Sequence, residues 1–363
     1  MKKAIPFILF LALFIISCKD KEEDGLSSIT YSPTTYELAY SKVFPKMIIP
    51  ADNPLTTEGV ELGRFLFYDK LLSANGTMAC ASCHLPEGGF TDNLATSKGI
   101  DGIFGKRSAM SLSNIGFVNS GLFWDGRVQT LEEQAFLPVE DPIELHNNWT
   151  KVVEKFKVHP DYPTRFRKAF GIATTAEITK ELAIKAIAQF ERTLISDNAK
   201  IDQIARDRTI KFTDDEFDGF QLFFNDVGVA DAQCGHCHTS PFYGSNDYFN
   251  NGLDSAATLD DFRDKGRGQF TKIQSDNGKF RVPSLRNIEL TAPYMHDGRF
   301  KTLEEVLDHY ASGGHYAPNI DPFIPQIKSI NLTQKQRGKI IAFLKTFTDT
   351  TFVNNPKLKS PFL

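Results

Sequence analysis

Two short cysteine motifs constrain this chain more than any other feature of its sequence. "CASCH" occupies residues 80–84 and "CGHCH" occupies residues 234–238. C-x-x-C-H is the pattern in which two thiols form thioether bonds to a haem while the adjacent histidine ligates the iron. We therefore predict two covalently bound haem c groups. The predicted attachment residues are Cys80, Cys83, Cys234 and Cys237, and the predicted iron ligands are His84 and His238.

Other uses of these cysteines fit the spacing less well. A zinc ribbon keeps its two C-x-x-C pairs within about 15 to 20 residues, whereas Cys80 and Cys234 are 154 positions apart (234 minus 80). A redox-active dithiol does not need a histidine directly after it, twice. Disulfides form in exported chains, but adjacent C-x-x-C cysteines close too short a loop to clamp a fold well.

The N-terminus predicts export. Lys2 and Lys3 precede an apolar run of thirteen residues, 4–16, which is too short to span a bilayer but suits a signal peptide over 1–17. The run ends in "IISC", which resembles a bacterial lipobox, so Cys18 is expected to be acylated and to anchor the protein to a membrane. The alternative is cleavage elsewhere, with Cys18 an idle thiol. Residues 18–49 are expected to form the lipidated N-terminus and a tether, of which the polar stretch 19–37 is expected to be flexible. This predicts a periplasmic, membrane-anchored protein.

Charge narrows the class of partner. Loss of Lys2 and Lys3 with the signal peptide takes the formal net charge from −4 to −6. This mild acidity argues against nucleic acid and is compatible with a basic protein partner.

A repeated phrase predicts an internal duplication. "WDGRVQTLEE" at 124–133 returns as "HDGRFKTLEE" at 296–305, an offset of 172, and "SLSNI" at 111–115 is echoed by "SLRNI" at 284–288. Each copy follows one C-x-x-C-H motif. We therefore expect two haem domains, at 50–205 and 206–363.

The repeat also predicts where two helices begin. Thr130 with Glu133, and Thr302 with Glu305, have the spacing of capping boxes. One face of the second helix carries Leu303, Val306, Leu307 and Tyr310, and the same face of the first carries Leu131, Gln134, Ala135 and Pro138.

If this face covers the haem, the two irons differ. The second meets the phenol of Tyr310, whereas the first meets Pro138, which has nothing to donate, and stays open. A core tyrosine is the alternative for Tyr310, and His309, Met295 and His296 remain rival ligands.

Longer stretches carry a resemblance to a known family. "ELGRFLFYDKLLSANGTMACASCH", "FWDGR", "LEEQAFLP", "KFRVPSLRNIELTAPYMHDGR" and "LEEVLDHY" resemble the bacterial dihaem cytochrome c peroxidases, most closely the branch that includes the dihaem oxidase MauG. The resemblance implies a mostly α fold of two cytochrome c-like domains, with peroxide chemistry at the N-terminal haem and electron transfer at the C-terminal haem. It matches Trp124 to a tryptophan between the haems, and Gln134 and Glu144 to active-site residues. It also implies a calcium ion held by the carbonyls of Thr291 and Pro293.

Chemistry gives the matched side chains their expected roles. Glu144 would move a proton between the two peroxide oxygens as a general acid and base. Gln134 would orient peroxide, because an amide both donates and accepts hydrogen bonds.

Three departures from the family pattern matter. No histidine lies between His84 and His146, so we expect the first iron to be open without prior reduction. Tyr310 stands where the peroxidases usually have methionine, and a phenolate favours ferric iron. Ser108 replaces an asparagine calcium ligand, which weakens the expected calcium site.

The sequence thus predicts a peroxidase that reduces hydrogen peroxide to water with electrons from a small redox protein such as a cytochrome c. The alternatives are a MauG-like oxidase of a protein substrate and a non-catalytic dihaem electron carrier. A homodimer is a further expectation.

Overall fold

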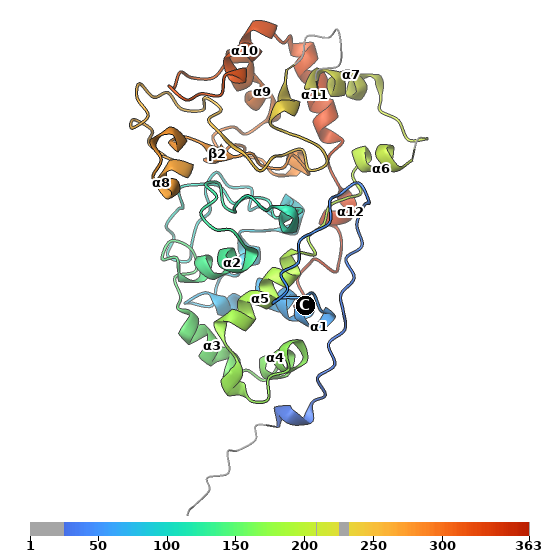
Figure 1. Ribbon diagram of the computed structural model, residues 1–363, viewed down its shortest axis with the longest axis vertical. Helices are drawn as coiled ribbons and strands as arrows, with labels where there is room; N and C mark the ends of the chain where they lie inside the picture. The colour runs from blue at the N-terminus through green and yellow to red at the C-terminus, as the bar shows by residue number, and fades with distance from the viewer. Residues whose placement is uncertain (1–24, 208, 225–231, 363) are drawn as a thin grey trace, which may run out of the picture.

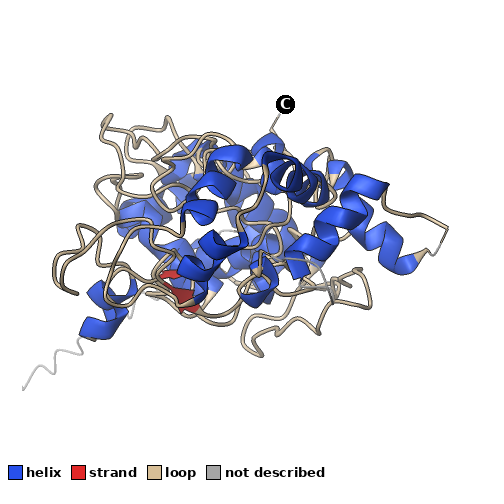
Figure 2. Ribbon diagram, turned by 90° about the horizontal axis from the view of Figure 1, so that it is seen from above, coloured by secondary structure: helices blue, strands red, loops and turns tan. Residues whose placement is uncertain are grey.

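The computed structural model describes residues 25–207, 209–224 and 232–362, and within these ranges the protein is mostly α, as predicted. Its only sheet there pairs β1 (Tyr248–Phe249) with β2 (Phe280–Arg281) in antiparallel register. The α-helices are α1 (Thr57–Tyr68), α2 (Leu131–Glu140), α3 (Trp149–Val158), α4 (Tyr162–Phe170), α5 (Lys180–Glu191), α6 (Lys200–Arg206), α7 (Asp214–Phe224), α8 (Arg267–Thr271), α9 (Leu303–Ser312), α10 (Phe323–Ile330), α11 (Gln334–Lys345) and α12 (Thr350–Val353). Figure 2 shows how much of the molecule between these helices is loop.

The helices gather into two halves stacked along the long axis of the molecule (Figure 1). One hydrophobic cluster lies around α1, α2, α3, α4 and α5. A second lies around α7, α9, α10 and α11. Each half therefore has a core of its own.

A glycine lets two helices cross closely in each half. A Cβ added to Gly63 of α1 would lie 1.9 Å from the carbonyl oxygen of Ala186 in α5. A Cβ added to Gly219 of α7 would lie 2.0 Å from the carbonyl oxygen of Lys339 in α11. Only a residue without a side chain permits either approach.

The two cores cross the predicted limits of 50–205 and 206–363. Phe352, Val353 and Leu358, near the C-terminus, belong to the first cluster. Ala199 and Ile201 belong to the second. The chain ends therefore cannot be assigned to the halves by sequence order alone.

The prediction of a flexible stretch over 19–37 is wrong for its described part, 25–37, because Thr35 pairs with Thr56 in an antiparallel bridge and the Thr34 amide donates to Glu58. The rest of the tether, to residue 49, is also held against the protein. Leu26, Phe44 and Met47 are buried, and the Ser41 amide donates to Asp197 Oδ2 at 2.6 Å. In Figure 1 this blue segment runs up the side of the molecule to the junction between the halves. The buried apolar side chains hold this segment against the rest of the protein, because each gains by burial. The predicted signal peptide and Cys18 lie outside the described residues.

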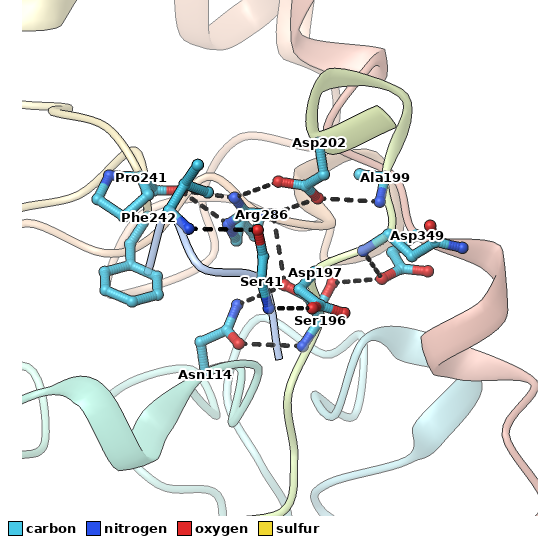
Figure 3. A network of polar contacts seen from close by, with 12 residues as sticks. Ser41, Asn114, Ser196, Asp197, Ala199, Asp202, Pro241, Phe242, Arg286 and Asp349 are labelled. Carbon is cyan, nitrogen blue, oxygen red and sulfur yellow. Dashed lines mark hydrogen bonds and ion pairs between the residues drawn. The ribbon is translucent and has the colours of Figure 1, made fainter. Parts of the chain in front are cut away.

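A buried polar network joins the halves (Figure 3). Arg286 is paired with Asp202 through two hydrogen bonds of 2.8 Å, and it also donates to the carbonyl oxygen of Pro241. Asn114, from the first half, exchanges two 3.0 Å hydrogen bonds with the backbone of Ser196. Such fully partnered buried groups fix one geometry of the junction.

Across the described ranges, no helix combines the length and apolarity that crossing a bilayer requires.

Candidate functional site

The first C-x-x-C-H motif forms a tight turn that aims its histidine inward. Cys80–Ser82 is a 3-10 turn, and His84 Nδ1 lies 2.9 Å from the carbonyl oxygen of Phe90. Since a carbonyl only accepts, Nδ1 carries the proton and Nε2 keeps a free lone pair. Burial lowers the pKa of His84, while the carbonyls of Phe90 and Met110 oppose the shift. A neutral imidazole is the form that ligates iron.

The second motif repeats this arrangement. Cys234–His236 is again a 3-10 turn, and His238 Nδ1 lies 2.9 Å from the carbonyl oxygen of Tyr243. Burial lowers the pKa of His238 to about 4. Phe90 and Tyr243, which provide the accepting carbonyls, both have positive φ, 63° and 52°.

Within the described residues, none of the four motif cysteines forms a disulfide bond. Burial raises the pKa of Cys83 and of Cys237 to about 12. In each motif the 3-10 turn begins at the first cysteine, and the second cysteine directly precedes the histidine. Two sulfur atoms and one imidazole nitrogen are therefore available at each site. This donor set fits a haem c in each half.

A cavity of about 250 Å³ adjoins the second motif. It is mostly apolar, and α9 forms part of its wall. The predicted inward face of α9 is confirmed, because all four of its residues line this cavity. The residues relevant to ligation are Cys234, Cys237, His238, Met295, His296 and Tyr310.

Two of the candidate iron ligands, Tyr310 and Met295, share one hydrogen-bond partner inside this cavity. The Asn251 side-chain nitrogen lies 3.3 Å from Tyr310 Oη and 3.5 Å from Met295 Sδ. Burial raises the pKa of Tyr310 to about 12. His309 instead donates from Nε2 to the Asn251 carbonyl oxygen at 3.0 Å, and His296 stacks on Phe280 with ring centroids 3.7 Å apart.

The predicted capping boxes are present at both helices, α2 and α9. Burial repeats as well: Leu131 and Leu303, the first residues of the two helices, are both buried. Pro138 in α2 and Tyr310 in α9 are both half-buried, eight positions after their caps. The proline therefore stands in the first half at the helix position that the phenol occupies in the second.

Glu144 lies close enough to the first motif to affect its thiols. Its negative charge contributes to raising the pKa of Cys80 and of Cys83. Burial, helped by Asp141 and opposed by Arg127, raises the pKa of Glu144 to about 7. This value suits a group that both gives and takes a proton near neutral pH.

Gln134 and Trp124 differ in how firmly they are held. The half-buried side chain of Gln134 makes no hydrogen bond within the described residues. Trp124 donates from Nε1 to the Ser108 carbonyl oxygen at 3.0 Å, and its own carbonyl accepts from the Arg281 amide at 2.8 Å. Trp124 also lines the cavity beside the second motif, so it lies at the junction between the halves.

Comparison with known proteins agrees with this geometry. A family model described as di-haem cytochrome c peroxidase matches residues 57–209. The methylamine utilization protein MauG of Methylorubrum extorquens is 34% identical over 356 residues, covering 95% of this chain and 96% of the relative. This chain belongs to the di-haem cytochrome c peroxidase family. The cytochrome c551 peroxidase of Nitrosomonas europaea is 34% identical over 326 residues, covering 88% of this chain and 87% of that protein.

A solved structure of the family has the same fold. It is a crystal structure of a MauG-like protein associated with microbial copper homeostasis, with a TM-score of 0.81 and 34% sequence identity. The match covers 90% of this chain and all of that chain (100%).

The residues matched to the family calcium site lie at the junction. Thr291 and Pro293 line the cavity beside the second motif. The Asn93 side-chain amide donates to the neighbouring carbonyls of Leu290 and Ala292, at 2.7 and 2.9 Å. Ser108 donates its hydroxyl to the Met295 carbonyl oxygen. No group of three His, Cys, Asp or Glu side chains suited to a metal occurs within the described residues. Calcium binding in this family member therefore stays a prediction.

Sequence reasoning missed Asn251 and Arg281. Asn251 contacts Met295 and Tyr310, two of the three candidate ligands that line the cavity, and Arg281 is a buried cation in the cavity wall. Nothing in the local sequence marks either one, because asparagine and arginine are ordinarily surface residues.

Proposed function

We propose that this protein reduces hydrogen peroxide to water at the N-terminal haem, with two electrons from a small redox protein passing through the C-terminal haem. The observation that carries the proposal is the difference between two equivalent helix positions. Pro138 has no side-chain group that could ligate the first iron, whereas Tyr310 presents a phenol in the cavity beside the second motif. The peroxidases among the relatives support the same activity.

When bound, the first haem supplies the iron at which peroxide binds and is reduced. In our proposal Glu144 takes the proton from one peroxide oxygen and delivers it to the other, which leaves as water. The pKa of about 7 lets Glu144 exist in both required forms near neutral pH. Gln134, with no protein partner within the described residues, is free to hydrogen-bond the substrate and orient it.

Trp124 is proposed to carry electrons between the halves. Trp124 lines the cavity beside the second motif. Its indole donates to the carbonyl of Ser108, and two residues further along the chain the carbonyl of Met110 raises the pKa of His84. This position between the two histidine ligands supports the role.

We further propose that the halves arose by internal duplication. The matching capping boxes, the paired glycine crossings and the two equivalent histidine turns support it. Residues 50–205 and 206–363 remain the proposed domains, apart from the cross-packing described above. A calcium ion on Thr291 and Pro293, a periplasmic location, a lipid anchor at Cys18 and a homodimer belong to the same proposal.

A second candidate function rests on Tyr310. A phenolate ligand lowers the tendency of iron to be reduced, which hinders electron entry from a high-potential cytochrome c. This favours a MauG-like oxidase that removes electrons from a protein substrate, and the 34% identity to MauG agrees with it. A purely electron-carrying protein is disfavoured by Pro138 and by the tuned Glu144.

The deciding experiment is stopped-flow absorbance of the fully ferric protein mixed with one equivalent of hydrogen peroxide and no reductant. An immediate change in the haem bands supports an open first iron, and turnover with reduced cytochrome c then supports the peroxidase. Reaction with peroxide but no turnover with any small redox donor favours the oxidase. No reaction until one haem is reduced contradicts the open site.

A further inference from the structure

Among the described residues, Arg281 is a buried cation without an acidic partner. Its side chain is only 6% exposed. Its guanidinium donates from Nε to the Phe123 carbonyl oxygen at 3.3 Å and from Nη2 to the weak acceptor Met110 Sδ at 3.5 Å. Within the described residues no carboxylate pairs with it.

This arrangement is costly for the protein alone. Burial lowers the pKa of Arg281 to about 10, and only Tyr248 opposes the shift. A buried ion without a compensating charge is strongly destabilising. Asp125 and Asp264, two acidic residues of this junction, are already ion-paired with Arg107, at 2.7 and 2.8 Å. Asp321 lines the same cavity as Arg281, but within the described residues it forms no ion pair with Arg281. The fold therefore holds a positive charge that its own acidic side chains do not neutralise.

The cavity beside Arg281 indicates which anion would pair with this guanidinium. Arg281 lines the same cavity as Cys234, Cys237 and His238. A haem held by those cysteines has its thioether edge beside them and its two propionate carboxylates at the opposite edge. The Arg281 guanidinium donates to Phe123 and Met110 of the first half, and within the described residues it makes no hydrogen bond to the cysteine turn at 234–238.

We propose that Arg281 binds a propionate carboxylate of the second haem. The planar guanidinium suits this ligand, because its parallel N–H groups match two carboxylate oxygens. Tyr248 is the titratable side chain that acts on Arg281, and it is itself covered by Arg267, whose Cζ lies 3.8 Å from the ring centroid. The proposal rests on haem attachment at the second motif and not on peroxide turnover.

The test compares Arg281→Met and Arg281→Lys with the wild-type holoprotein. Resonance Raman spectra report the propionate bending modes of the haems, and spectroelectrochemistry gives the midpoint potential of the second haem. Arg165→Met is the control, since Arg165 is paired with Glu61 on the surface of the first half.

Both readouts should move together in Arg281→Met. We expect a propionate bending band to shift and the potential to fall, because the lost cation had favoured the reduced, less positive haem. Arg281→Lys should keep most of the potential but still shift the band, since an ammonium cannot form the two-armed contact. Arg165→Met should change neither.

Two results would overturn the proposal. One is an unchanged bending band in both variants, which would mean that Arg281 acts only through its charge or its packing. The other is a loss of thermal stability in Arg281→Met with both haem readouts unmoved. If Arg281→Met fails to fold, Arg281→Lys alone decides through its band. A protein that ignores peroxide would leave every one of these readouts intact, so the two proposals fail separately.

Discussion

The phenol oxygen of Tyr310 lies 3.3 Å from the side-chain nitrogen of Asn251, inside the cavity that adjoins the second haem motif. In the absence of iron, burial keeps this phenol neutral, with a pKa raised to about 12. A metal ion that binds the phenolate would reverse this preference.

Replacing Tyr310 should therefore change the second haem. In Tyr310→Phe we expect altered ferric absorption and a higher midpoint potential, because an anionic ligand that favours ferric iron is gone. Spectra of the oxidised variant and a redox titration measure both. Met295→Leu is the matched comparison, because Met295 shares Asn251 as a partner. Unchanged spectra in Tyr310→Phe with altered spectra in Met295→Leu would transfer the ligand role to Met295.

Glu144→Gln should slow the reaction with peroxide by about 10² to 10⁴-fold, the usual contribution of a general acid and base. In the wild type the rate should rise as pH passes about 7, because the carboxylate form accepts the first proton. The amide variant should lose this pH dependence. Stopped-flow rates between pH 5.5 and 8.5 (about 1.5 units on each side of that value) test it. Glu181→Gln, on the exposed face of α5, should react like the wild type.

The buried carboxyl of Glu191 leads to a prediction about how the free energy of unfolding depends on pH. Its carboxyl is buried, Oε2 has no hydrogen-bond partner within the described residues, and burial raises its pKa to about 8. The unfolded chain has the ordinary value of about 4.3. The folded state thus binds the extra proton between these values, so the free energy of unfolding falls as pH rises from about 4.3 through 8.

Glu191→Gln removes this titration. The melting temperature of the variant minus that of the wild type should therefore increase steadily from pH 5 to pH 8, by differential scanning calorimetry. The surface variant Glu154→Gln should show no such trend. A constant difference for Glu191→Gln would mean that the carboxylate has a partner in the holoprotein.

Phe44→Ala should loosen the junction. The Phe44 ring packs against Phe117 and Phe242, with centroids 5.6 and 4.8 Å away, and lies 4.7 Å from the Arg286 guanidinium. Loss of a buried phenylalanine costs about 3 to 5 kcal/mol. Denaturant unfolding followed at the haem bands measures the loss. Ile48→Ala, four residues along and 72% exposed, should cost little. Equal effects of the two variants would contradict the packing role.

Features encoded by short sequence patterns could be predicted. The haem motifs and the capping boxes at Thr130 and Thr302 use residues within five positions of one another, so they read directly from the sequence. The inward face of α9 followed from its helical period and is confirmed by the cavity that it lines.

Contacts between distant residues could not be predicted. Residues 25–49 mix polar and apolar side chains, and Phe44 and Met47 are the ones that become buried near the junction, but nothing in the local sequence says that Phe117 and Phe242 lie against Phe44. Arg281 likewise looks like a surface residue until the surrounding loops bury it. The return of the C-terminus to the first core is of the same kind.

That return bears on how the protein is assembled in the cell. Phe352 of α12 packs 5.3 Å from Phe90, ring centroid to ring centroid, and the Phe90 carbonyl holds His84. The first haem motif is thus completed by residues made more than 250 positions later (352 minus 90). An N-terminal fragment ending near residue 205 would lack this support, so attachment of the first haem should finish only after residue 352 has emerged.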